Sequence, residues 1–128
     1  MAKVIKTYYT DKQLKEIYFE NNGIKEGEYI HYNEDGQLYV KCNYVNGMKE
    51  GKLSTYYNNG RICVECSYTN GKKEGEFKLY HENGQLHIKC NHVNDMNDGE
   101  YNTYNIDGKL CNTYNYVHGK LCSISKLC

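Results

Sequence analysis

Two pairs of residues in the middle of the chain have the spacing of half-sites for zinc. They are Cys63-x-x-Cys66 and His87-x-x-Cys90, and thiolate and imidazole are ligands that zinc prefers. Both pairs lie where apolar residues alternate with polar ones, as in Leu86–Cys90, and this alternation predicts a β-strand. Residues three apart in a strand point to opposite faces of a sheet, so neither pair can converge on one ion. We therefore predict no metal site.

Nucleophilic catalysis is the second chemistry that the residue types could support. The chain has 7 Cys and 5 His, yet the sequence pattern orients no base against a thiol. Asp35, Glu82 and Asp107 lie in turn sequences, where backbone conformation alone accounts for acidic residues. The candidates also recur along the chain, whereas an active site is a singular arrangement. We predict no enzymatic activity, no catalytic residue and no cofactor.

A repeat of 24 residues organises the whole chain. The glycines recur in three series: Gly27, Gly51, Gly75 and Gly99; Gly36, Gly60, Gly84 and Gly108; and Gly23, Gly47, Gly71 and Gly119, with Asp95 in the place of one glycine. A repeat at a fixed period indicates an architecture in which each unit packs against its neighbours.

Each unit contains two strand signals separated by turn signals. Residues 75–80 form the first, the Asn83-Gly84 dipeptide favours a hairpin turn, and residues 86–92 form the second. Another turn, such as Asn70-Gly71, leads into the next unit. Connections this short join antiparallel neighbours. The sequence therefore predicts an all-β fold, an elongated open antiparallel β-meander of tandem hairpin repeats with about two strands per repeat.

The pattern Gly-Glu-Tyr/Phe-x-x-Tyr-x-x-x-Gly-x-Leu, followed by Tyr-x-x-Gly-Lys-x-x-Gly, resembles the MORN repeat. It is most similar to the longer variant found in bacterial and large-virus proteins. The resemblance covers five units, approximately residues 3–26, 27–50, 51–74, 75–98 and 99–122, followed by a tail at 123–128. No Pro- or Ser-rich linker interrupts them, so residues 1–128 are expected to form a single domain. The resemblance implies a scaffold, a partner-binding arm or a membrane-associated module.

The first unit departs most from the pattern. Ile17 and Phe19 stand where later units have polar residues, which is typical of a capping repeat, although these residues could instead cover a partner. The tail is expected to form one more edge strand or a frayed end.

One column of cysteines recurs in units two to four. Cys42, Cys66 and Cys90 occupy equivalent positions, roughly 9–10 Å apart in a meander, and a disulfide needs Cα atoms closer than about 7 Å. We predict that they are buried free thiols.

Two aromatic columns are the remaining candidates for a binding site. One contains Tyr29, Phe77 and Tyr101, with Leu53 among them, and the other contains Tyr32, Tyr56, Tyr80 and Tyr104. They could form the core of a thin sheet, or leave ring faces exposed in a groove that binds a helix or an extended peptide.

Charge and composition exclude several classes. Sixteen basic and 16 acidic residues give a net charge of zero, without the basic run expected of a nucleic-acid binder, and membrane lipid is disfavoured for the same reason. No signal peptide or membrane span is recognisable, so a cytoplasmic location with reduced thiols is the default expectation. Richness in Asn, Lys, Tyr and Ile suggests an A+T-rich genome.

We therefore expect a non-catalytic MORN-repeat scaffold that binds a protein partner. The alternatives are a lipid or membrane-surface module, and an antitoxin-like protein with a partner toxin. The ends of the chain, Val4–Tyr9 and Leu121–Ile124, also read as strands that contain no Pro, which favours a homodimer through a sheet edge.

Overall fold

The computed structural model describes residues 2–128, and all of their regular structure is β. The strands are β1 (Lys3–Tyr8), β2 (Leu14–Asn21), β3 (Ile24–Tyr32), β4 (Leu38–Val45), β5 (Met48–Lys49), β6 (Gly51–Tyr56), β7 (Ile62–Thr69), β8 (Lys72–Lys73), β9 (Gly75–Tyr80), β10 (Leu86–Val93), β11 (Met96–Asn97), β12 (Gly99–Tyr104), β13 (Leu110–Val117) and β14 (Lys120–Lys126). Together they form one 14-stranded sheet.

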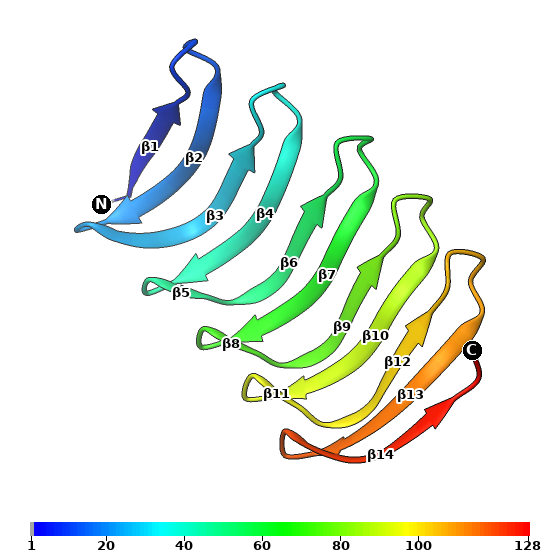
Figure 1. Cartoon of the computed structure of the whole chain (residues 1–128). Helices are drawn as coiled ribbons and strands as arrows, with labels where there is room; N and C mark the ends of the chain where they lie inside the picture. The colour runs from blue at the N-terminus through cyan, green and yellow to red at the C-terminus, as the bar shows by residue number, and fades with distance from the viewer. Residues whose placement is uncertain (1) are drawn as a thin grey trace.

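The sheet is a single curved layer (Figure 1). The strands follow one another in chain order and pair antiparallel, as in β3 with β4 and β6 with β7, while β5, β8 and β11 are short additions to β4, β7 and β10. The hairpin turns form two rows along the long sides of the sheet, and the two chain ends lie at its opposite ends (Figure 1). The predicted open meander is confirmed.

One row of turns contains the glycine series Gly36, Gly60, Gly84 and Gly108, each glycine preceded by Asn or Asp. In the third unit the Arg61 carbonyl accepts the Tyr57 amide at 2.8 Å, and the Tyr57 carbonyl accepts the Gly60 amide at 2.9 Å. The side chain of Asn59 also accepts the Arg61 amide at 2.9 Å. Gly60 has a φ of 85°, which glycine adopts freely, so the expected positive φ of this glycine series is confirmed.

The other row consists of two-residue hairpin turns. Asn46 and Gly47 both have positive φ, 51° and 79°, and Asn94 and Asp95 repeat the geometry with 50° and 70°. Two consecutive positive φ values define the type I′ turn, whose twist suits an antiparallel hairpin. Asn and Asp tolerate this conformation better than most residues, which explains why Asp95 can replace glycine.

The first strand of units three to five is longer and more bent than the sequence predicted. Lys49 pairs with Tyr44 and Ser54 pairs with Lys41, so this strand has two residues more than its neighbour between these pairs. The extra length includes Glu50 and Gly51, whose φ of 80° favours glycine. Such an insertion bends a strand and interrupts its pairing. It divides the strand into β5 and β6, and the same happens at β8–β9 and β11–β12.

An acidic residue precedes Gly51 and each equivalent glycine of the other units, and it forms a hydrogen bond to the next unit. Its carboxylate accepts a hydrogen bond from a backbone amide in the hairpin turn 20 positions along the chain. The four bonds are Asn46 N to Glu26 at 3.1 Å, Asn70 N to Glu50 at 3.0 Å, Asn94 N to Glu74 at 2.7 Å and His118 N to Asp98 at 3.0 Å. Each unit is thus tied to its neighbour through side chain as well as backbone.

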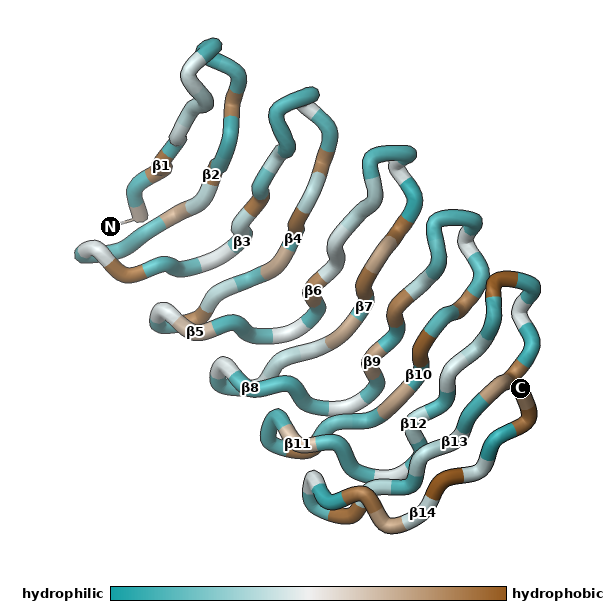
Figure 2. Tube along the Cα trace, viewed as in Figure 1, coloured by the Kyte–Doolittle hydropathy of each residue, from teal (hydrophilic) through white to brown (hydrophobic). Residues whose placement is uncertain are grey.

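The core lies on one face of the sheet and is thin. Among residues 2–128, the buried apolar side chains are Cys42, Leu53, Cys66 and Cys90, each 5–7% exposed. Half-buried side chains pack against the first three of them: Tyr29, Tyr44, Val64, Tyr68 and Phe77. Apolar positions recur along the strands, whereas the row of turns that contains Gly36, Gly60, Gly84 and Gly108 is mostly hydrophilic (Figure 2).

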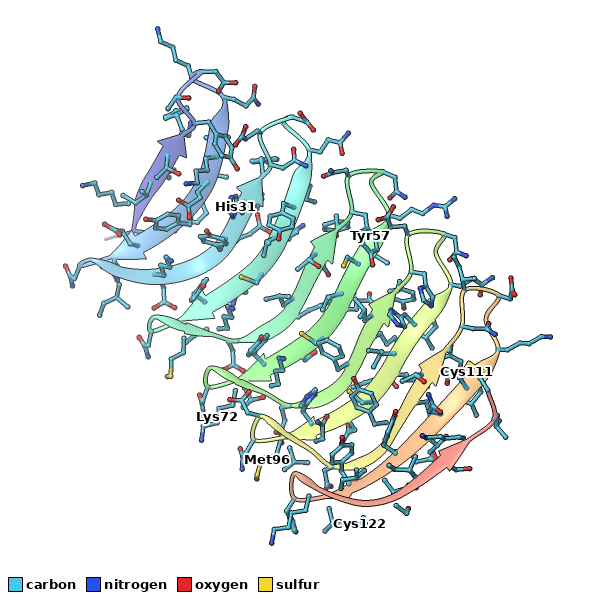
Figure 3. The ribbon with its side chains drawn as sticks, in the orientation of Figure 1. His31, Tyr57, Lys72, Met96, Cys111 and Cys122 are labelled. Atoms are coloured by element: carbon cyan, nitrogen blue, oxygen red, sulfur yellow. A yellow bond between two sulfur atoms is a disulfide. The ribbon has the colours of Figure 1, made fainter. Side chains whose placement is uncertain are left out.

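The cysteines confirm one prediction and correct another. Cys42, Cys66 and Cys90 are buried and unpaired, as predicted from their spacing. The expectation of reduced thiols throughout is wrong for Cys111 and Cys128, which form a disulfide. Spacing between units could not reveal this bond. It joins Cys111 in β13 to Cys128, which follows β14 and lies directly beside β13. The Leu127 amide donates to the Cys111 carbonyl at 2.6 Å. The tail is therefore a strand whose end is fastened to β13 (Figure 3).

Candidate functional site: the aromatic face

The two predicted aromatic columns lie on opposite faces of the sheet. Side chains alternate between faces along a strand, and the columns are an odd number of residues apart, as Phe77 is from Tyr80. Phe77 is on the face that contains the core, which we call the aromatic face. Tyr80 is on the other, which we call the polar face, where its hydroxyl donates to Glu65 at 3.3 Å. The columns therefore do not line one groove.

On the aromatic face the predicted column is joined by a second row of rings from the neighbouring strands. Tyr29 has the Tyr18 ring at 5.5 Å on one side and the Tyr44 ring at 5.7 Å on the other, measured between centroids. The remaining contacts are Phe77 with His92 at 5.5 Å, and Tyr101 with Tyr114 at 5.7 Å and with Tyr116 at 6.0 Å. Most are edge or tilted contacts, which aromatic pairs prefer.

Sequence reasoning missed this second row as part of the site. Tyr44 and Tyr68 follow Cys42 and Cys66 by two residues, so the alternation already put them on the same face. That signal was read as strand periodicity alone. It could have identified these tyrosines as neighbours of the first column.

Three lysines at the repeat spacing lie over these rings, and sequence reasoning missed them as well. The Lys25 ammonium is 5.0 Å from the Tyr29 centroid, that of Lys49 is 5.2 Å from Tyr68, and that of Lys73 is 5.1 Å from Phe77. A cation within about 6 Å of a ring centroid is attracted to the ring face. The aromatic face therefore combines flat apolar surface with a row of positive charges.

Glu16 is a carboxylate in a column that is apolar in units two to four. It accepts a hydrogen bond from the Tyr29 hydroxyl and another from Thr7 Oγ1 at 2.8 Å. These bonds lower the pKa of Glu16, the one from Tyr29 most, with smaller contributions from the charges of His31 and Lys25. Burial and the bond to Glu16 raise the pKa of Tyr29. Glu16 is therefore an anion held beside the rings.

The thiols of this face are chemically quiet. Burial raises the pKa of Cys42 and Cys66, and it raises that of Cys90 to about 11, although nearby lysines oppose the effect. Because the thiolate is the nucleophile and the metal ligand, a thiol with a raised pKa is poorly suited to either role. These cysteines act as small apolar side chains of the core.

The polar face carries the other predicted column together with surface ion pairs. Tyr56 lines a hollow of about 440 Å³ and Tyr104 one of about 470 Å³. The ion pairs are Lys41–Glu28, Lys52–Glu65, Lys78–Glu76 and Lys89–Glu76, at 3.1–3.7 Å. Exposed pairs of this kind contribute little to stability. This face is mixed in charge and offers no row of like charges.

The histidines near the first row of turns have structural contacts. His81 Nε2 lies 3.0 Å from the Tyr104 carbonyl oxygen, and its ring stacks on His87 with centroids 4.0 Å apart. Tyr57, at the same position one unit earlier, donates its hydroxyl to the Tyr80 carbonyl at 2.5 Å. These contacts tie one unit to the next. In residues 2–128, no group of three or more His, Cys, Asp or Glu side chains could hold a metal ion.

The geometry defines a class, the open β-repeat proteins in which each hairpin unit contacts only its neighbours. Three consecutive segments, residues 25–46, 49–70 and 73–94, match the MORN repeat variant family. The chain belongs to the MORN-repeat family. Comparison with curated proteins finds no match to the chain.

In the part of the chain that the structure describes, no helix is long and apolar enough to cross a bilayer.

Proposed function

We propose that the protein is a non-catalytic scaffold whose aromatic face binds a segment of another protein. The observation that carries this proposal is the row formed by Lys25, Lys49 and Lys73, each with its ammonium over a ring of that face. Tyrosine offers large contact area at a low cost in conformational entropy, which suits a protein interface. The cations favour a partner that carries acidic residues. Membership of a repeat family without enzymatic activity agrees with a binding role.

The spacing of the units fits an amphipathic helix lying across the strands. Equivalent residues of successive units are two strands apart, about 9–10 Å. Seven residues of an α-helix rise about 10.5 Å, so positions one heptad apart would meet equivalent columns of successive units. We propose a helical partner with apolar residues facing the rings and acidic residues at heptad spacing facing the lysines.

The test is affinity purification from the source cell followed by mass spectrometry, with three forms of the protein in parallel. The first is the wild type, the second carries Lys49→Glu and Lys73→Glu on the aromatic face, and the third carries Lys52→Glu and Lys78→Glu on the polar face. The proposal expects one set of proteins to be recovered with the first and third forms and lost from the second. Identical recovery with all three, or loss only from the third, contradicts it.

Two further variants, with the aromatic-face variants as controls, test the membrane alternative. Exposed apolar side chains lie beside the row of two-residue turns. Among them are Ile24, Met48 and Met96, which are 43–49% exposed. Lys72 lies in the same column (Figure 3). Apolar side chains beside cations favour a lipid surface. Co-sedimentation with anionic liposomes that is abolished by Met48→Ser and Met96→Ser, and unchanged by the aromatic-face variants, would support a membrane-surface role instead.

A further inference from the structure

Three tyrosines of the first two units surround one ammonium group. The Lys25 nitrogen lies 5.1 Å from the ring centroid of Tyr18, 5.0 Å from that of Tyr29 and 5.2 Å from that of Tyr44. The rings come from β2, β3 and β4, and they are not stacked, because Tyr18 is inclined 33° and Tyr44 69° to Tyr29. They therefore form separate walls around a common centre.

Among residues 2–128, Lys25 is the only lysine that lies over three rings. Lys49 lies over the Tyr68 ring and Lys73 over the Phe77 ring, one ring each. The reason is visible in the sequence. Beside Lys49, Cys42 and Leu53 stand in the places of Tyr18 and Tyr29, and beside Lys73, Cys66 and His92 stand in the places of Tyr18 and Tyr44. The repeat architecture alone thus does not require three rings around one cation.

The surroundings of the three rings favour a cation over an anion or a neutral group. The Glu16 carboxylate accepts a hydrogen bond from the hydroxyl of Tyr29, one of the three rings, and it interacts electrostatically with Lys25. None of the ion pairs among residues 2–128 involves Lys25, so no carboxylate oxygen lies within 4.0 Å of its ammonium. Lys25 is the second residue of β3, just after the turn at Asn22 and Gly23, and its side chain is only half-buried. Its side chain can therefore move out into solvent.

We infer that Tyr18, Tyr29 and Tyr44 form a binding site for a quaternary ammonium group, in which Lys25 is the displaceable internal occupant. A primary ammonium is strongly hydrated and loses that hydration among rings. A trimethylammonium group is weakly hydrated, and its methyl groups can contact several ring faces at once, so it is the better occupant of such a cage. The inference does not rest on the proposed partner helix.

The test is calorimetric titration with tetramethylammonium chloride at constant ionic strength. Lys25→Ala empties the cage and is expected to bind the probe about tenfold more tightly than the wild type. Lys49→Ala is the matched control, because Lys49 covers a single ring, and it should leave the affinity unchanged. Equal gains in both variants, or no saturable binding by Lys25→Ala, would overturn the inference.

A second pair of variants separates the cage from the fold. In the Lys25→Ala background, Tyr44→Leu removes one wall and should weaken binding about fivefold or more, whereas Tyr44→Phe keeps the ring and should preserve it. Circular dichroism establishes that each protein is folded. If Tyr18→Leu and Tyr44→Leu are both folded and bind as Lys25→Ala does, the rings are not the site.

Two further ligands identify the source of the group. Phosphocholine represents a lipid headgroup, and a short peptide containing trimethyl-lysine represents a modified protein. The tighter of the two indicates the natural class of ligand. The same peptide with unmodified lysine should bind about fivefold more weakly than its trimethylated form. Equal affinity for both forms contradicts the assignment to quaternary ammonium groups.

Discussion

At the scale of the residue, the turn at Asn94 and Asp95 shows how one substitution in the repeat is accommodated. Asp95 has a φ of 70°, and its side chain accepts the Lys73 amide at 2.6 Å. In three of the other turns the glycine at the same place lies close to an apolar side chain. The absent Cβ of Gly47, for example, would be 3.1 Å from Ile24. In the unit with Asp95 that column holds Lys72, which is longer and charged. The unit that has Asp95 instead of glycine therefore also has Lys72 instead of an apolar residue at the neighbouring position.

The glycine series that includes Gly60 and Gly84 gives a direct test of backbone conformation. We expect Gly84→Ala to lower the free energy of unfolding by about 1 kcal/mol, because its φ is 91°. Gly84→Asn should cost less, since Asn tolerates positive φ better. Gly60→Ala is the matched control, because nothing lies within 4 Å of an added Cβ there, so its cost reflects φ alone. Urea denaturation measures all three, and unchanged stability would contradict the prediction.

Glu16 gives a prediction for the dependence of stability on pH. Its pKa in the folded protein is lower than the ordinary value of 4.5, mainly because of the bond from Tyr29. A lowered pKa contributes stability that is fully present above the ordinary value and is lost as the pH falls through the folded value. We therefore expect Glu16→Gln to be less stable than the wild type at pH 7, and the difference to shrink below about pH 4.5. Thermal melts between pH 3 and 7 measure it. A constant difference would show that ionisation of Glu16 is not involved.

At the scale of the element, the sequence was sufficient for the hairpins but not for their bends. Alternating apolar residues such as Leu86, Ile88 and Cys90 and the turn dipeptide Asn83-Gly84 are local signals, and local signals determine strands and turns. The insertion at Glu50-Gly51 depends on pairing with a strand from the previous unit, so the register had to be known first. The role of Glu50 in fastening the next turn is hidden for the same reason.

The candidate site was predictable in part. The columns of Tyr29 and Tyr32 were recognised from their period. Their odd separation, which puts them on opposite faces of the sheet, was not used. The position of a lysine ammonium over a ring depends on the rotamers of a long side chain, which no spacing determines. The cage around Lys25 therefore became visible only with side chains in place.

The disulfide between Cys111 and Cys128 leads to a prediction about β13 and β14. Thiol titration of the denatured, unreduced protein should find five free cysteines, Cys42, Cys63, Cys66, Cys90 and Cys122, and seven after reduction. Reduction should also speed amide exchange in β14, whose residues are all exposed, because the bond fastens the end of this strand. Cys111→Ser should reproduce that effect without a reductant. A disulfide peptide joining any two of Cys42, Cys66 and Cys90 would contradict the assignment.

At the scale of the whole molecule, the outer edges of the sheet favour self-association. Within residues 2–128, β1 pairs only with β2 and β14 only with β13. On β1, Val4 is 50% and Tyr8 55% exposed, and an unpaired edge with apolar side chains can pair with a second copy. We expect light scattering to detect a dimer at high micromolar concentration. Val4→Lys with Tyr8→Lys should weaken a dimer formed through β1, and Leu121→Lys with Ile124→Lys is the matched pair for β14. A wild-type mass of 15.0 kDa at all concentrations would show that both edges remain unpaired.

The direction of the strands has a mechanical consequence. They run across the long axis of the sheet, so their backbone hydrogen bonds point along it, and the two chain ends lie at opposite ends of that axis (Figure 1). A force applied to the two ends would load these bonds one pair of strands at a time rather than all together. We expect stretching in optical tweezers to give a series of small, similar rips, each releasing one 24-residue unit, about 80 Å of extended chain. With its disulfide intact, the protein would keep the segment between Cys111 and Cys128 closed and its full extension correspondingly shorter, so the molecule behaves as a graded extensible tether rather than a brittle strut.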